Sequence, residues 1–173
     1  MLSLPRSAEA IGAVAAPPVV LFAFLDDHRN LSAHMSKSSW MMLGSTMNLH
    51  SDAGNARALG SRFGFEGAIL GIPLSVDEVV VEHRAPQRKV WDTLGEPRLW
   101  VIGAYSMGFE ITPLVGASRL RVFISYALPK SGFPKFLGLF FGGVYAKWCT
   151  DRMVGDAQRH FSGQPTAALT RAN

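Results

Sequence analysis

Residues 40–127 form a succession of short runs rich in β-branched and aromatic side chains, separated by glycine, proline and asparagine. Such runs predict β-strands, and connections as short as 85–87 and 95–97 have the spacing of hairpin turns, so consecutive strands should pair antiparallel. A further strand is expected at 6–15, where the alternation of apolar residues is weaker. The strands predicted in the central region are 40–49, 60–70, 74–84, 88–94, 99–112 and 118–128.

After Pro129 and Gly132 the apolar residues recur at three- and four-residue spacing, which predicts one long helix over 133–161. A glycine inside a helix costs about 1 kcal/mol relative to alanine. The glycines of this helix therefore indicate either close approach of another element or empty space. The expected buried stripe consists of Phe133, Leu137, Phe140, Val144 and Trp148.

Two short helices are expected after the first strand, one that begins at Pro17 and Pro18 and one over 30–35. Together the elements predict an α+β domain, a seven-stranded antiparallel sheet curved around a long C-terminal helix. This single domain should span 6–161, and the polar residues 162–173 should form a flexible tail.

The composition favours an interior that is large for the length of the chain. Hydrophobic residues make up 48% and charged residues 17%, so much of the chain must face inward or bind an apolar molecule. The single cysteine, Cys149, excludes an internal disulfide, and a reducing cytoplasm is the expected compartment. The apolar runs 19–25 and 136–146 are shorter than the about 20 residues that a membrane span needs.

The formal net charge of +4 raises the question of an anionic partner. The basic residues are dispersed, and the nearest approach to a cluster, Arg84, Arg88 and Lys89, lacks interleaved aromatic residues. We therefore expect no nucleic-acid partner. Weak peripheral contact with a membrane is an alternative use of the basic surface, and the oligomeric state is left open between monomer and homodimer.

Charged residues assign an inner and an outer face to four strands, because successive side chains of a strand point to opposite faces. In strand 74–84, Glu78, Glu82 and Arg84 mark the solvent face, which sends Val79, Val81 and His83 inward. The sequence does not indicate which alternate residues face inward in the strands at 6–15, 40–49 and 88–94. On the other strands the residues expected to face inward are Phe63, Phe65, Val101, Tyr105, Met107, Phe109, Leu120, Val122, Ile124 and Tyr126.

A recognisable stretch opens with Val14-Ala15-Ala16-Pro17-Pro18 and continues with Val20, Phe22, Phe24, Leu25 and Asp26. Further along the chain are the strand with Trp91, the Gly95-Glu96-Pro97 turn, and Tyr145, Trp148 and Cys149 before Met153. In these stretches and in the order of its elements the sequence resembles the bacterial polyketide cyclase/dehydrase and lipid-transport family of the START and Bet v 1-like (SRPBCC) superfamily. The resemblance implies a helix-grip fold with a cavity between sheet and final helix that holds a hydrophobic ligand; it carries over no reaction.

No catalytic fingerprint is present in the sequence. There is no Gly-x-Ser-x-Gly elbow, no pair of histidines has zinc-ligand spacing, and the glycines form no phosphate-binding loop. We therefore expect neither a metal nor a cofactor. His83, Tyr105 and Asp92 are the candidate general acids, weighed against core tyrosines whose hydroxyls are satisfied locally and a solvated carboxylate at Asp92.

Two functions follow as hypotheses. The first is binding of a lipid-like, isoprenoid or aromatic molecule in the cavity; the alternative is a cyclase, aromatase or dehydratase in which a polar cavity residue transfers a proton. Methionines 41, 42 and 47 would add adaptable walls. The expected ligand-binding residues are Phe63, Phe65, Val79, Val81, Trp91, Val101, Tyr105, Met107, Phe109, Val122, Ile124, Tyr126, Phe140, Val144 and Trp148.

Overall fold

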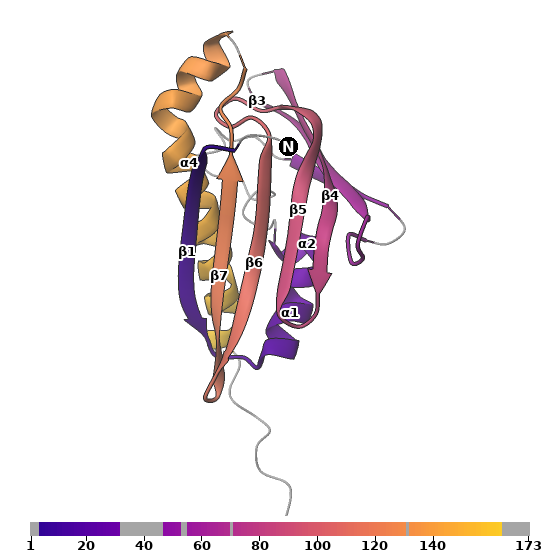
Figure 1. Cartoon of the computed structure of the whole chain (residues 1–173), viewed down its shortest axis with the longest axis vertical. Coiled ribbons are helices and arrows are strands. Elements are labelled where there is room, and N and C mark those ends of the chain that lie inside the picture. The colour runs from indigo at the N-terminus through magenta and orange to yellow at the C-terminus, as the bar shows by residue number, and fades with distance from the viewer. Residues whose placement is uncertain (1–3, 32–46, 53–54, 70, 131, 164–173) are drawn as a thin grey trace, which may run out of the picture.

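A computed structural model describes residues 4–31, 47–52, 55–69, 71–130 and 132–163. It contains one antiparallel sheet in the order β1-β7-β6-β5-β4-β3-β2, with α4 and α1 against the same face (Figure 1). We call this the inner face and the opposite one the outer face. The strands are β1 (Arg6–Val14), β2 (Met47–Ser51), β3 (Arg62–Ile69), β4 (Ile72–Arg84), β5 (Arg88–Arg98), β6 (Tyr105–Leu114) and β7 (Ala117–Tyr126), and the helices are α1 (Pro18–Asp26), α2 (His28–Leu31) and α4 (Gly132–Ser162).

The predicted architecture is confirmed. Strands β2 to β7 form a meander, and β1 pairs with β7 along its whole length, from Arg6 opposite Tyr126 to Val14 opposite Ser118. Residues 32–46, and with them most of the predicted strand 40–49 and the end of the predicted helix 30–35, lie outside the described residues, as do residues 164–173 of the expected tail.

Strand β5 is longer than predicted, because Gly95-Glu96-Pro97 lies inside it and does not form a turn. Leu94 pairs with Asp77 and Arg98 with Ser75, so three residues of β5 stand opposite the single residue Val76. Gly95 has a φ of 64°, a left-handed conformation that glycine adopts without a Cβ clash. The tripeptide is therefore a bulge in the sheet.

A second bulge makes half of the predicted parity of β4 wrong. Val80 pairs with Trp91 and Glu82 with Val90, so Val81 is an extra residue. Before it, the even-numbered residues Leu74, Val76, Glu78 and Val80 are buried on the inner face; after it, the phase changes and His83 points inward. Val79 is half-buried on the outer face and Val81 is 43% exposed, so both predicted positions are incorrect.

Strand β6 begins at Tyr105, six residues later than predicted, and Val101 belongs to the preceding connection. The connection still follows the end of β7, because Gly103 N–H donates to the carbonyl of Ala127 and Ala127 N–H donates to that of Ala104. The connection is not paired with β5, since the residues of β5 that pair with β6 are only Arg88 to Asp92.

The face of α4 that packs on the sheet also differs from the prediction. Its N-terminal half buries Gly138 and Gly142, and its C-terminal half buries Ala146, Met153, Ala157 and other residues against β1 and β7. Phe133, Phe140 and Val144, which were predicted in the buried stripe, are each more than half exposed, while Leu137 and Trp148 are half-buried. Small residues occupy the buried face of the helix because a Cβ at Gly138 would lie 2.7 Å from the carbonyl oxygen of Val101.

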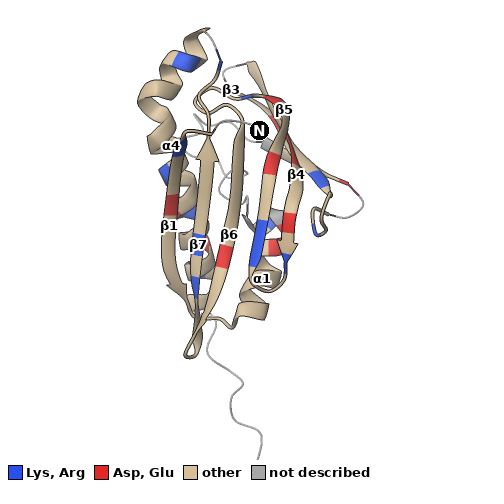
Figure 2. Cartoon of the chain, viewed as in Figure 1, with Lys and Arg blue, Asp and Glu red and all other residues tan. Residues whose placement is uncertain are grey.

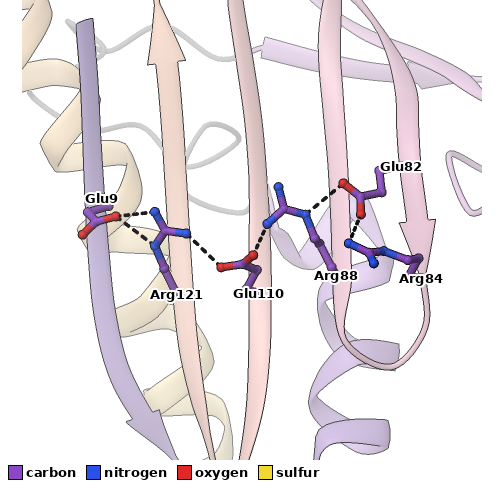
Figure 3. A network of polar contacts seen from close by, with 6 residues as sticks. All are labelled: Glu9, Glu82, Arg84, Arg88, Glu110 and Arg121. Carbon is purple, nitrogen blue, oxygen red and sulfur yellow. Dashed lines mark hydrogen bonds and ion pairs between the residues drawn. The ribbon is translucent and has the colours of Figure 1, made fainter.

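A row of ion pairs crosses five strands on the outer face (Figure 3). Arg121 contacts Glu9 at 2.7 Å and Glu110 at 2.8 Å, Glu110 also contacts Arg88, and Arg88 contacts Glu82 at 2.9 Å. Glu110 stands directly opposite both Arg88 and Arg121 in the ladders. Opposite charges facing each other across strands stabilise this register over a slip by one residue, which would move the charges to the inner face.

Candidate ligand-binding site

The inner face is lined by aromatic and aliphatic side chains from the middle of each strand. The ring centroid of Trp91 lies 6.3 Å from that of Phe63 and 6.5 Å from that of Phe109, and Phe22 of α1 meets Phe109 at 5.4 Å. Strand parity places these rings together, because Phe109 and Trp91 lie on neighbouring strands and share the inner face. The other buried residues of this face include Phe65, Met107, Val122, Ile124 and Tyr126.

A carboxyl group interrupts this apolar face. Glu78 of β4 is 1% exposed, and the Tyr105 hydroxyl of β6 donates a hydrogen bond of 2.7 Å to its Oε1 atom. The other oxygen, Oε2, is buried and has no hydrogen-bond partner among the residues that the structure describes. A buried polar atom without a partner costs about 1–3 kcal/mol, so this arrangement is destabilising unless a further group arrives.

Burial raises the pKa of Glu78 to about 8, although the hydrogen bond from Tyr105 and the nearby polar indole of Trp91 oppose the shift. At pH 7 the carboxyl is therefore about tenfold more often protonated than ionised, and it can donate a hydrogen bond as well as accept one. Burial also raises the pKa of Tyr105 well above its usual value, and the neighbouring Glu78 adds to this shift. The pair is accordingly neutral at physiological pH.

Helix α4 places two further polar groups near Tyr105. Tyr145 interacts electrostatically with Tyr105 and hydrogen-bonds to Cys149, one turn further along the helix. Burial raises the pKa of the Cys149 thiol to about 12, so the thiol stays protonated and is a poor nucleophile. The inner face therefore presents neutral donors and acceptors at this point, with no fixed charge.

A charged cluster occupies the other end of the inner face, beside α1. Nζ of Lys89 lies 2.6 Å from Oδ1 of Asp26, and Nε2 of His83 lies 3.0 Å from the same oxygen. The Lys89 side chain has no exposed surface, and burial lowers its pKa, while the bond to Asp26 opposes that shift. Since Asp26 ends α1, this cluster fastens the helix to the sheet.

The three candidate acids therefore lie in three different places. Tyr105 belongs to the buried pair with Glu78, and His83 belongs to the cluster with Asp26. Asp92 stands opposite Val79 on the outer face, because its neighbour Trp91 points inward. The structure thus brings Asp92 together with neither Tyr105 nor His83.

Glu78 and Lys89 are the residues that sequence reasoning missed. Glu78 was predicted on the solvent face, and Lys89 was counted among the dispersed basic residues, yet both are buried on the inner face. A signal for Glu78 does exist: Leu74, Val76 and Val80 form an apolar alternation whose phase includes it. A carboxyl at an otherwise apolar position of one face is therefore a candidate for burial on that face.

A hollow of about 590 Å³ lies along the outward side of α4. Val144 and Trp148, two of the predicted ligand-binding residues, line it, with Gly143, Lys147, Asp151 and Arg152. No group of three His, Cys, Asp or Glu side chains within the described ranges is arranged to hold a metal ion.

Comparison with solved structures finds this fold in proteins of low sequence identity. TTHA0849 from Thermus thermophilus matches with a TM-score of 0.65 and 12% identity, over 91% of this chain and 98% of that one. The Zhui aromatase/cyclase from Streptomyces sp. R1128 matches with a TM-score of 0.64 and 13% identity, over 95% and 99%. Ara h 8.0201 matches with a TM-score of 0.61 and 11% identity, over 92% and 99%.

Identities this low establish the fold alone, which is the helix-grip fold that the resemblance in the sequence implied. Neither the models of protein families nor the curated proteins contain a match to the sequence. The fold does not indicate a function by itself, because an aromatase/cyclase and Ara h 8.0201 share it. The evidence for a function therefore has to come from the residues of the site.

Proposed function

We propose that the protein binds a small, mainly apolar molecule against the inner face of the sheet, and that Glu78 hydrogen-bonds to a neutral polar group of that molecule. The observation that carries the proposal is the unpartnered Oε2 atom of a carboxyl that is 1% exposed. The fold supports it, because helix-grip proteins present an inner sheet face to a terminal helix. The surrounding aromatic rings would bury the apolar part of the ligand.

The protonation state of Glu78 selects the polar group. A protonated carboxyl, whose Oε1 already accepts from Tyr105, offers a donor to a ketone, aldehyde or hydroxyl oxygen. A carboxylate ligand would place an uncompensated negative charge beside the neutral Glu78, in a site without a nearby cation among the described residues that surround it, and burying that charge is costly. We therefore expect uncharged carbonyl or hydroxyl compounds as ligands.

Two probes of the same shape test this proposal. We expect 2-acetylnaphthalene, a ketone, to bind about fivefold more tightly than 2-ethylnaphthalene, its hydrocarbon counterpart, because one hydrogen bond contributes about 1 kcal/mol. Glu78→Leu should remove this preference while retaining binding of the hydrocarbon. Calorimetric titration measures both affinities. The proposal would be contradicted if neither probe binds and a native mass spectrum shows no co-purified apolar ligand.

A second function is favoured by the same pair. Glu78 has a pKa of about 8 and lies beside a tyrosine hydroxyl, which suits a general acid acting on a carbonyl oxygen near neutral pH. Proton transfer of this kind belongs to cyclisation and dehydration of oxygenated carbon chains. We propose it as the alternative function, with Glu78 in the role that the sequence offered to His83, Tyr105 or Asp92.

Exchange of the acidic protons of 2-acetylnaphthalene in deuterated water, followed by NMR, tests the alternative. Glu78 would protonate the carbonyl oxygen while solvent takes the proton from the neighbouring carbon, so the protein should accelerate the exchange above its rate in buffer. This acceleration should decline as pH rises through about 8, where Glu78 loses its proton. Glu78→Gln should abolish the acceleration and still bind the probe. If the unsubstituted protein binds 2-acetylnaphthalene but does not accelerate the exchange, the enzymatic function is excluded and the binding function is retained.

A further inference from the structure

The N-terminal half of α4 has an unusual distribution of side chains. It turns its glycines, Gly138 and Gly142, to the protein and its large apolar residues to solvent. An ordinary surface helix does the opposite. Phe133, Phe136, Leu139, Phe140, Phe141 and Val144 are each between 54% and 67% exposed. We call these six residues the α4 apolar surface.

The cause of this arrangement is the close approach of the helix to the β5–β6 connection. A Cβ at Gly138 or Gly142 would lie 2.7 or 2.8 Å from the carbonyl oxygen of Val101, so only glycine fits on that side. The large apolar residues of this half of α4 therefore lie on the side of the helix that faces solvent. Large apolar residues that are exposed side by side on one helix face mark an interaction site.

The charge around the α4 apolar surface is positive. Lys130, Lys135 and Lys147 lie in or beside this half of the helix, and the sequence has no Asp or Glu between residues 128 and 150. Figure 2 shows the same half of α4 without acidic residues, at the end of the molecule where the helix extends past β1. Lys130 pairs with Glu96 and Lys147 with Asp151, but all four side chains are more than half exposed, so these pairs are weak and exchangeable.

We propose that the α4 apolar surface docks on an anionic lipid bilayer, with its phenylalanines in the headgroup region and its lysines on the lipid phosphates. Aromatic residues beside lysines, without acids, suit a helix that lies in the membrane interface. No helix in the described part of the chain is long and apolar enough to cross a membrane, so the contact is peripheral. A second copy of the chain fits less well, because a symmetric contact would bring like charges together around Lys135.

Vesicle flotation tests this proposal independently of ligand binding. The unsubstituted protein should bind phosphatidylcholine vesicles that contain about 30% phosphatidylserine, should bind pure phosphatidylcholine far less, and should dissociate as salt increases. The double substitution Phe136→Ser with Phe140→Ser should reduce binding about tenfold or more, since each removes an inserted aromatic ring. Lys135→Glu should reduce it severalfold.

The matched control is Leu59→Ser with Ile72→Ser, two exposed apolar residues that do not belong to α4, which should leave vesicle binding unchanged. Circular dichroism and the melting temperature establish that each variant is folded. The proposal is overturned if the unsubstituted protein does not float with anionic vesicles at low salt, or if both double variants bind equally. It is also overturned if the protein is a dimer that the α4 substitutions convert to a monomer, because a second copy would then occupy the surface.

Discussion

Asp26, the last residue of α1, holds Lys89 of β5 by an ion pair of 2.6 Å, although no part of the Lys89 side chain is exposed. The ammonium group also donates to the backbone carbonyl of Asp26 at 3.2 Å. A buried cation of this kind depends on its partner, because removing one charge leaves the other without compensation.

Asp26→Asn should therefore lower the free energy of unfolding by about 3 kcal/mol. Urea denaturation measures the change. Asp151→Asn serves as the control, since it breaks the exposed pair with Lys147 and should cost less than about 1 kcal/mol. Equal effects of the two substitutions would show that the Lys89 pair is no more important than a surface contact.

Glu78 should make the stability of the protein depend on pH. Its pKa is about 8 in the folded protein and 4.5 for a glutamate in water, so the folded protein binds the proton more tightly than the unfolded chain. The contribution of Glu78 to stability is thus fully present below pH 4.5, declines between about pH 4.5 and 8, and levels off above. The difference in unfolding free energy between the unsubstituted protein and Glu78→Gln should fall by a few kcal/mol across that range.

Glu66, which is exposed on β3, provides the comparison for that experiment. Glu66→Gln removes a carboxyl from an exposed position, so it should change the unfolding free energy by no more than about 0.5 kcal/mol. A pH-independent difference for Glu78→Gln would mean that the carboxyl is ionised in the folded protein.

Neighbouring glycines of α4 should respond to alanine in opposite directions. At Gly142 the new Cβ would lie 2.8 Å from the backbone oxygen of Val101, so Gly142→Ala should destabilise by about 1–3 kcal/mol despite the better helix propensity of alanine. At Gly143 the nearest atom is the Tyr126 hydroxyl at 3.7 Å, and Gly143→Ala should stabilise by up to about 1 kcal/mol. Thermal unfolding of the two variants distinguishes them, and a gain at both positions would contradict the close approach of α4 to the connection.

The row of ion pairs on the outer face should stabilise the folded protein mainly at low salt and above acidic pH. The hydrogen bond from Arg121 lowers the pKa of Glu110, so the stabilisation is present above the usual carboxyl range and is lost as pH falls through the lowered value. Glu110→Gln should cost about 1 kcal/mol at low salt, measured by urea denaturation, and less at high salt. A cost that does not change with salt would point to packing instead of charge.

The order of the elements and the antiparallel pairing were predictable because they rest on local patterns. Alternation placed Phe63, Phe65, Leu120, Val122, Ile124 and Tyr126 on the inner face, and the structure agrees. The same reasoning failed in β4 and α4. In β4 the extra residue Val81 reverses the phase, and in α4 the apolar spacing of Phe133, Phe140 and Val144 belongs to the exposed side.

The sequence by itself determined where strands and the long helix form, because side-chain periodicity and turn residues act within a few positions of the chain. Only the tertiary structure decided the position of the bulges, the rotation of α4 and the burial of Glu78 beside Tyr105. These features depend on contacts between residues far apart in sequence, such as Gly142 with Val101, and the closeness of such contacts is a property of the assembled fold.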